Sequence, residues 1–117
     1  MKRDMDLARA ILLQVEKSDD LKDWVKITVD GHSEEQISYH IKLLDQANLI
    51  EATDCSSADG LSWKATSLTW HGHEFLDAAR NETFWNKAKS YLKGKGIEIT
   101  FDTIKTALTK IIKEQIE

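Results

Sequence analysis

The chain of 117 residues contains no proline, only one cysteine and no long apolar run. Without proline there is no Pro-rich linker. The single cysteine, Cys55, cannot form an internal disulfide, and its polar surroundings favour a structural or exposed thiol over a nucleophile. No stretch approaches the roughly 20 apolar residues of a membrane helix, and the start lacks the apolar region of a secretory signal. We therefore expect one cytoplasmic domain without a membrane helix.

Positive charge is also scarce, since 16 lysines and arginines face 20 acidic residues and the net charge is −4. Residues 24–69 hold three basic residues (Lys26, Lys42 and Lys64) and seven acidic ones (Asp30, Glu34, Glu35, Asp45, Glu51, Asp54 and Asp59). Protein binding to nucleic acid depends largely on neutralising phosphates, so this balance argues against free attraction to DNA without excluding it.

Helical spacing of apolar residues predicts helices over residues 4–17, 33–47 and 101–116, and two more after Thr69 and after Asn81 or Thr83. Ser33 and Gln36 fit a capping box, Asn48 suits the left-handed end of that helix, and Thr100 is a plausible cap for the last one. Gly94 and Gly96 are expected to end the fourth helix. The last helix either covers the domain or pairs with its copy in a dimer, and the short connection before it favours covering.

Strand patterns lie on both sides of the helix at 33–47. After a polar break at residues 18–23, Val25, Ile27 and Val29 alternate with polar neighbours or Trp24, which predicts a short edge strand. Residues 49–53 and 62–68 predict an antiparallel hairpin with a longer tip. The sum is an α+β, winged-helix-like fold with about five helices and up to three strands. Residues 1–96 form the winged-helix-like domain, and the C-terminal helix at 97–117 packs on it or is used for dimerisation.

In winged-helix proteins a recognition helix enters the major groove and the hairpin contacts the DNA backbone. Here that mechanism would place Tyr39, His40, Lys42 and Gln46 in a groove. Phosphates would be contacted by basic residues further along the chain, namely Lys64, Arg80, Lys87, Lys89, Lys93 and Lys95. The alternative for the lysines of residues 80–95 is a solvated helix face that balances the acidic remainder.

Metal binding and catalysis find little support. His71 and His73 are two residues apart, so on a helix they point to different faces, and Cys55 is not placed to complete a tetrahedral site. His40 and His73 are expected to be partly buried and hydrogen-bonded. There is no nucleophile motif and no Gly-rich phosphate loop. We expect no metal, no cofactor and no enzyme activity.

Three motifs, MKRDMDLARAILLQ, ISYHIKLLDQANLI and LTWHGHEFLDAARNETFWNKAK, together resemble a family of uncharacterised bacterial and phage-associated proteins, catalogued as a domain of unknown function. The similarity spans residue 1 to about Gly96 and implies a mobile-element context. The second motif followed by LTWHGHEFL is more distantly similar to small winged-helix repressors. Trp70, Gly72, His73 and Trp85 lie in these motifs and are expected to serve packing.

Two functions therefore remain open. One is a non-enzymatic DNA-binding or transcription-regulatory protein of mobile-element or phage origin. The other is a protein-protein interaction module that keeps the winged-helix scaffold and uses the acidic Glu34 and Glu35 face, or the apolar helix at residues 101–116, against a protein partner or a second copy.

Overall fold

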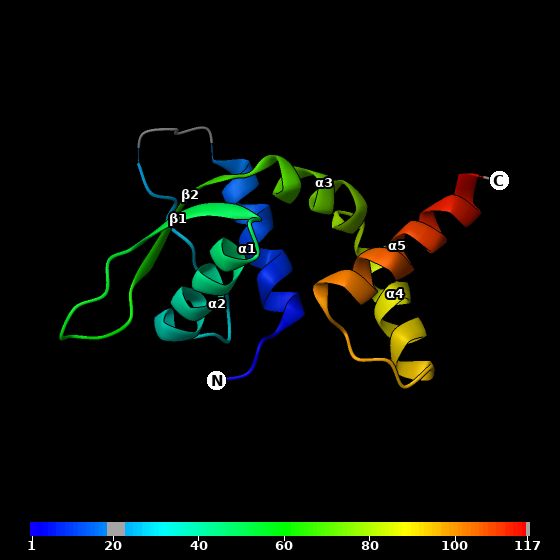
Figure 1. Ribbon diagram of the computed structural model, residues 1–117, viewed down its shortest axis with the longest axis horizontal. Coiled ribbons are helices and arrows are strands. Elements are labelled where there is room, and N and C mark those ends of the chain that lie inside the picture. The colour runs from blue at the N-terminus through cyan, green and yellow to red at the C-terminus, as the bar shows by residue number, and fades with distance from the viewer. Residues whose placement is uncertain (19–22, 117) are drawn as a thin grey trace. The chain divides into compact units, whose positions relative to one another are not determined.

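The computed structural model describes residues 1–18 and 23–116, where it contains five helices and one antiparallel sheet of two strands (Figure 1). The elements in chain order are α1 (Met5–Lys17), α2 (Glu34–Gln46), β1 (Ile50–Asp54), β2 (Trp63–Leu68), α3 (Trp70–Ala79), α4 (Glu82–Gly94) and α5 (Phe101–Ile116). The α+β class and the five helices are confirmed. Four positions of the expected polar break, 19–22, lie outside the described residues.

Backbone contacts divide the chain into two compact units, Met1–His73 (unit 1) and Glu74–Glu117 (unit 2). In unit 2, α5 packs against α4, and its buried residues are Ile104, Ala107 and Leu108. The expected division between a domain at 1–96 and a separate C-terminal helix stays a prediction, as does pairing of α5 in a dimer.

The helix starts are set by side-chain caps, as expected. The Ser33 hydroxyl accepts the amide of Gln36 at 3.1 Å, and the Gln36 side chain accepts the amide of Ser33 at 2.9 Å, which completes the capping box of α2. Asn81 accepts the Phe84 amide at the start of α4, and Thr100 accepts the Thr103 amide before α5. These bonds satisfy amides that have no partner inside their own helix.

The end of α2 leads directly into the hairpin. Asn48 takes the left-handed conformation at φ 64°, which turns the chain so that Leu49 and Ile50 are buried at the start of β1. The two strands pair with a bulge between Glu51 and Ala52. At this bulge the side chain of Asp45 in α2 accepts a hydrogen bond from the Ala52 amide at 3.2 Å.

The expected strand at residues 25–29 is wrong. The Val25 amide donates to the Ala65 carbonyl of β2 at 2.8 Å, but no further ladder bond joins the described segment to β2. Instead, the Gln14 side chain of α1 donates to the Thr28 carbonyl and accepts the Thr28 amide. Half-buried and exposed residues do alternate in this segment. However, the Gln14 side chain bonds to the amide and carbonyl of Thr28, which in a strand would bond to a neighbouring strand.

Each unit has its own core. In unit 1, α2 packs against α1, β1 and β2. The buried core of this unit includes Leu7, Ile11 and Leu12 of α1, Ile37, Ile41 and Leu44 of α2, and Leu49 and Ile50 at the start of β1. In unit 2, Phe75 contacts Trp85 edge-on, with ring centroids 6.3 Å apart, and Phe101 at 4.6 Å. Trp85 is therefore a packing residue, as expected.

Candidate functional site

The exposed side of α2 carries one continuous stripe. Glu35, Tyr39, Lys42 and Gln46 follow one another at spacings of four, three and four residues, so at about 100° per residue they share one face of the helix. Glu35 and Gln46 are exposed, and Tyr39 and Lys42 are half-buried. We call these four residues the α2 stripe. Three of its members, Tyr39, Lys42 and Gln46, were predicted to face a groove.

The charge of the α2 stripe differs from that of the helix as a whole. Asp45 points to β1, where it holds the Ala52 amide, and Glu34 lines a hollow on another side of α2. Only Glu35 shares the stripe with Lys42, so the face is balanced. The excess of acid counted along the sequence is therefore distributed over several faces and does not fall on this one.

His40 does not lie on the exposed face of α2, so the prediction that it faces a DNA groove is wrong. It is 2% exposed, its Nε2 accepts the Asp4 amide at 2.8 Å and its Nδ1 lies 2.8 Å from the Gln36 carbonyl. Because an amide can only donate, Nε2 must be unprotonated and Nδ1–H donates to Gln36. His40 is thus a buried residue with both nitrogens used, as the packing interpretation predicted.

The bond from Asp4 to His40 fixes the start of the chain beside α2. Asp4 also caps α1 by accepting the amides of Asp6 and Leu7. Lys2 and Arg3 directly precede this anchored residue, and both are exposed. Sequence reasoning missed this basic pair, because only the tertiary bond of Asp4 to His40 places residues 2–3 near residue 40.

The hairpin places the carboxylate of Asp54 close enough to Lys42 of α2 for their charges to interact. The pKa of the Asp54 carboxyl is lowered, first by the Ser56 hydroxyl and then by the Ser56 amide, with a smaller attraction from Lys42. Lys42 thus lies within electrostatic reach of the hairpin. The opposite charges of Lys42 and Asp54 therefore partly offset each other at this place.

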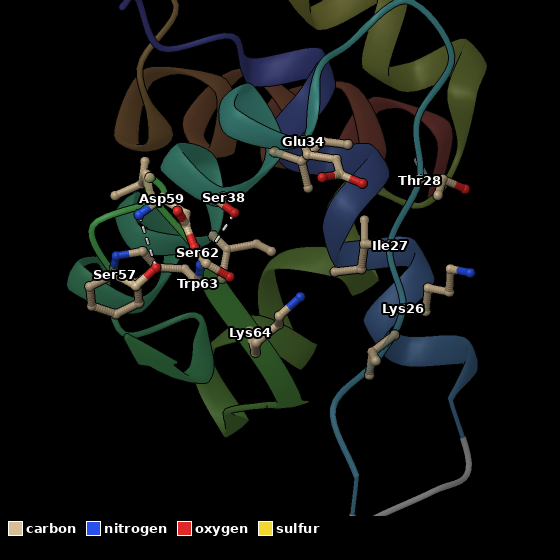
Figure 2. A pocket seen from close by; sticks show the side chains of 15 residues that line it. Lys26, Ile27, Thr28, Glu34, Ser38, Ser57, Asp59, Ser62, Trp63 and Lys64 are labelled. Atoms are coloured by element: carbon tan, nitrogen blue, oxygen red, sulfur yellow. Dashed lines mark hydrogen bonds between the residues drawn. The ribbon is translucent and has the colours of Figure 1, made fainter. Parts of the chain in front are cut away.

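Lys64 does not extend outward from the hairpin. Figure 2 shows its ammonium group pointing into a hollow of about 300 Å³ between α2, β2 and residues 25–28. Lys26 lines the same hollow, but its ammonium points away from it (Figure 2). A role of Lys64 in phosphate contact stays a prediction.

In unit 2 the predicted basic residues fall on different faces. Lys87, Tyr91 and Lys95 are spaced four residues apart and form one stripe, whereas Lys93 lies about 120° away from Lys87 around α4. Lys89 is half-buried, and Arg80 forms an exposed ion pair with Asp77 at 3.2 Å. Of these predicted residues, Lys95 has its ammonium over the Tyr91 ring, and Lys87 shares the Tyr91 face of α4 by its spacing.

Tyr91 is the centre of this second cluster. Its ring has the ammonium groups of Lys95 and of Lys110 at 5.8 and 4.8 Å from the centroid, and Lys110 also donates to the Tyr91 hydroxyl at 3.3 Å. Lys110 belongs to α5, so only the pairing of α4 with α5 brings it here. We call Lys87, Tyr91, Lys95 and Lys110 the Tyr91 cluster.

Two other expectations for residues of the family-like motifs fail. Trp70 is 82% exposed at the start of α3, although a packing role was expected, and His73 is exposed where partial burial was expected. Gly72 is buried and packs against the Leu49 backbone. Within residues 1–18 and 23–116, no three His, Cys, Asp or Glu side chains gather as a metal site.

The described part of the chain includes no helix with the length and hydropathy required to span a membrane. No solved structure matches the chain significantly. An uncharacterized protein of Haemophilus influenzae (strain ATCC 51907 / DSM 11121 / KW20 / Rd) is 42% identical over 117 residues, which cover 99% of each chain. The family model described as hypothetical protein (DUF2513) matches residues 2–98. The resemblance of the three motifs to a domain of unknown function is thereby confirmed, and the chain belongs to the DUF2513 family.

Proposed function

We propose that the protein is a non-enzymatic, cytoplasmic DNA-binding protein with a regulatory role, which reads duplex DNA with the α2 stripe. The observation that carries this proposal is the stripe itself: a capped helix, packed on α1 and followed at once by a hairpin, presents Tyr39, Lys42 and Gln46 on one face. Lysine and glutamine side chains bond to guanine and adenine edges in the major groove, and a tyrosine hydroxyl can bond to phosphate.

The anchored basic pair supplies the phosphate contacts that α2 lacks. Lys2 and Arg3 are exposed and adjacent to the Asp4–His40 bond, so they extend from a fixed point beside the reading helix. Two such contacts contribute sequence-independent affinity that weakens with salt. The Tyr91 cluster of unit 2 is a separate basic surface, and its contribution is to be measured by itself.

The test is a titration of a labelled mixed-sequence duplex, followed by fluorescence anisotropy at several salt concentrations. We expect binding at low salt that falls steeply as salt rises. Lys2→Gln with Arg3→Gln should reduce the magnitude of the slope of log K against log salt by about 2, since each phosphate contact contributes roughly 0.9. Lys87→Gln with Lys95→Gln measures the Tyr91 cluster in the same way.

Lys17→Gln is the matched control, because Lys17 is exposed at the other end of α1 from the basic pair. Its slope should stay unchanged, because Lys17 is not part of the proposed interface and a lost phosphate contact would change the slope by roughly 0.9. Absence of binding at the lowest salt would contradict DNA binding. Binding with an unchanged slope for the double variant would remove Lys2 and Arg3 from the interface.

A second candidate function is protein binding, favoured by two exposed tryptophans of unit 1. Trp70 is 82% exposed and Trp24 is 56% exposed, and large exposed aromatic side chains are enriched where proteins meet. A photocrosslinking residue at position 70 is expected to capture one defined protein in cells, whereas the same residue at position 17 captures none. Equal patterns from both positions would argue against this function.

A further inference from the structure

The hollow between α2, β2 and residues 25–28 is built from both apolar and polar groups. It measures about 300 Å³, the lower end of the range of small-molecule sites. Its apolar lining includes Ile27 from residues 25–28, and Ile37 and Ile41 from α2. The hairpin closes another side with Leu61, Ser62 and Trp63, so three parts of unit 1 enclose the space (Figure 2).

Two hydrogen-bond donors face this hollow without a protein acceptor. Lys64 directs its ammonium into the space, and no carboxylate of the described residues forms an ion pair with it (Figure 2). Ser38 is 9% exposed, and its oxygen accepts the Trp63 amide at 3.2 Å. The Ser38 hydroxyl hydrogen is still available, because no acceptor for it occurs within the described part of the chain.

We propose that this hollow binds a small organic carboxylate with an aliphatic body. A carboxylate has two acceptor oxygens and one negative charge, which match the Ser38 hydroxyl and the single Lys64 ammonium. The aliphatic part would cover Ile27, Leu61 and Trp63, which line the hollow and are half-buried, and would remove their remaining exposed surface from water. Glu34 and Asp59 also line the hollow and select against ligands with more negative charge, such as a phosphate dianion.

The hollow contains its own matched pair of lysines for a test. Both Lys64 and Lys26 line it and both are exposed, but only the Lys64 ammonium points inside (Figure 2). The probe is hexanoate, titrated into the ¹⁵N-labelled full chain, with the amide shifts of residues 25–28 and 61–64 as the readout. We expect saturable shifts at millimolar concentration. Lys64→Met should weaken binding at least tenfold, and Lys26→Met less than twofold.

Two analogues of hexanoate complete the experiment, the neutral hexanol and the cationic hexylamine. Hexanol should bind at least tenfold more weakly than hexanoate, because it lacks the charge that pairs with Lys64. If hexylamine binds more tightly than hexanoate and Glu34→Gln removes that binding, the site takes cations and the proposal is overturned. Absence of hexanoate shifts, or equal losses for both lysine variants, also overturns it. None of these outcomes depends on whether the protein binds DNA.

Discussion

Gly72→Ala is expected to destabilise the protein by about 3 kcal/mol, the upper end of the usual cost of overpacking. A Cβ at residue 72 would lie 2.0 Å from the Leu49 carbonyl oxygen and 3.1 Å from its carbon. Both neighbouring atoms are backbone, so no side chain can rotate away. The gain of about 0.5 to 1 kcal/mol that alanine brings to a helix interior does not offset this clash.

The close approach is held by two bonds of Thr69, three residues before Gly72. The Leu49 carbonyl also accepts the Thr69 amide at 3.0 Å, and the Thr69 hydroxyl accepts the Gly72 amide at 3.0 Å. Moving α3 away from Leu49 to admit a methyl group would therefore stretch at least one of these two bonds. Urea unfolding followed by circular dichroism measures the change in the free energy of unfolding.

Gly94→Ala is the matched control, because Gly94 is also helical but has no atom within 4 Å of an added Cβ. This variant should be more stable by about 0.4 to 1 kcal/mol, through the reduced freedom of the unfolded chain. If Gly72→Ala unfolds at the same urea concentration as the original protein, α3 does not approach Leu49 as described.

His40→Ala is expected to cost about 3 kcal/mol, from a cavity together with an unpaired amide. The ring is 2% exposed and lies edge-on to Tyr39, with centroids 5.8 Å apart. Its removal leaves the Asp4 amide without its acceptor. In hydrogen exchange, the Asp4 amide should lose protection while the helical amides of α4 keep theirs.

His73→Ala is the control for the second prediction, since His73 is exposed on α3. Surface changes of this kind usually stay within about 0.5 kcal/mol. An equally small effect of His40→Ala in urea unfolding would mean that the anchor of residues 2–4 beside α2 contributes no stability, and the position of the basic pair would lose its support.

Local features of the fold were predictable because their causes lie within a few residues. Ser33 with Gln36, Asn48, and Asn81 each act on amides or turns of their own segment, so the start and end of helices could be predicted from spacing alone. The hairpin was also predictable, because two apolar-containing runs flank a polar tip. The strand at residues 25–29 failed because a strand requires a partner backbone, and Gln14 bonds to Thr28 instead.

The candidate sites were predictable only in part, because spacing within one helix is local whereas burial and contacts between segments are not. The α2 stripe follows from helical spacing, so Tyr39, Lys42 and Gln46 could be assigned to one face. Burial of His40 and exposure of Trp70 depend on which elements cover them, which spacing along one helix does not determine. Lys110 could not be placed beside Tyr91 until α5 was seen to pack on α4.

The sequence by itself determined the α+β class, the helices with their caps, the hairpin and the family, because these depend on local bonding and on the identity of aligned residues. Only the tertiary structure decided which groups from distant parts of the chain meet. It brought Asp4 to His40, directed Lys64 into the hollow, and gathered Lys95 and Lys110 at Tyr91. The physical reason is that a site joins side chains from separate segments, and their distances are fixed only when those segments pack together.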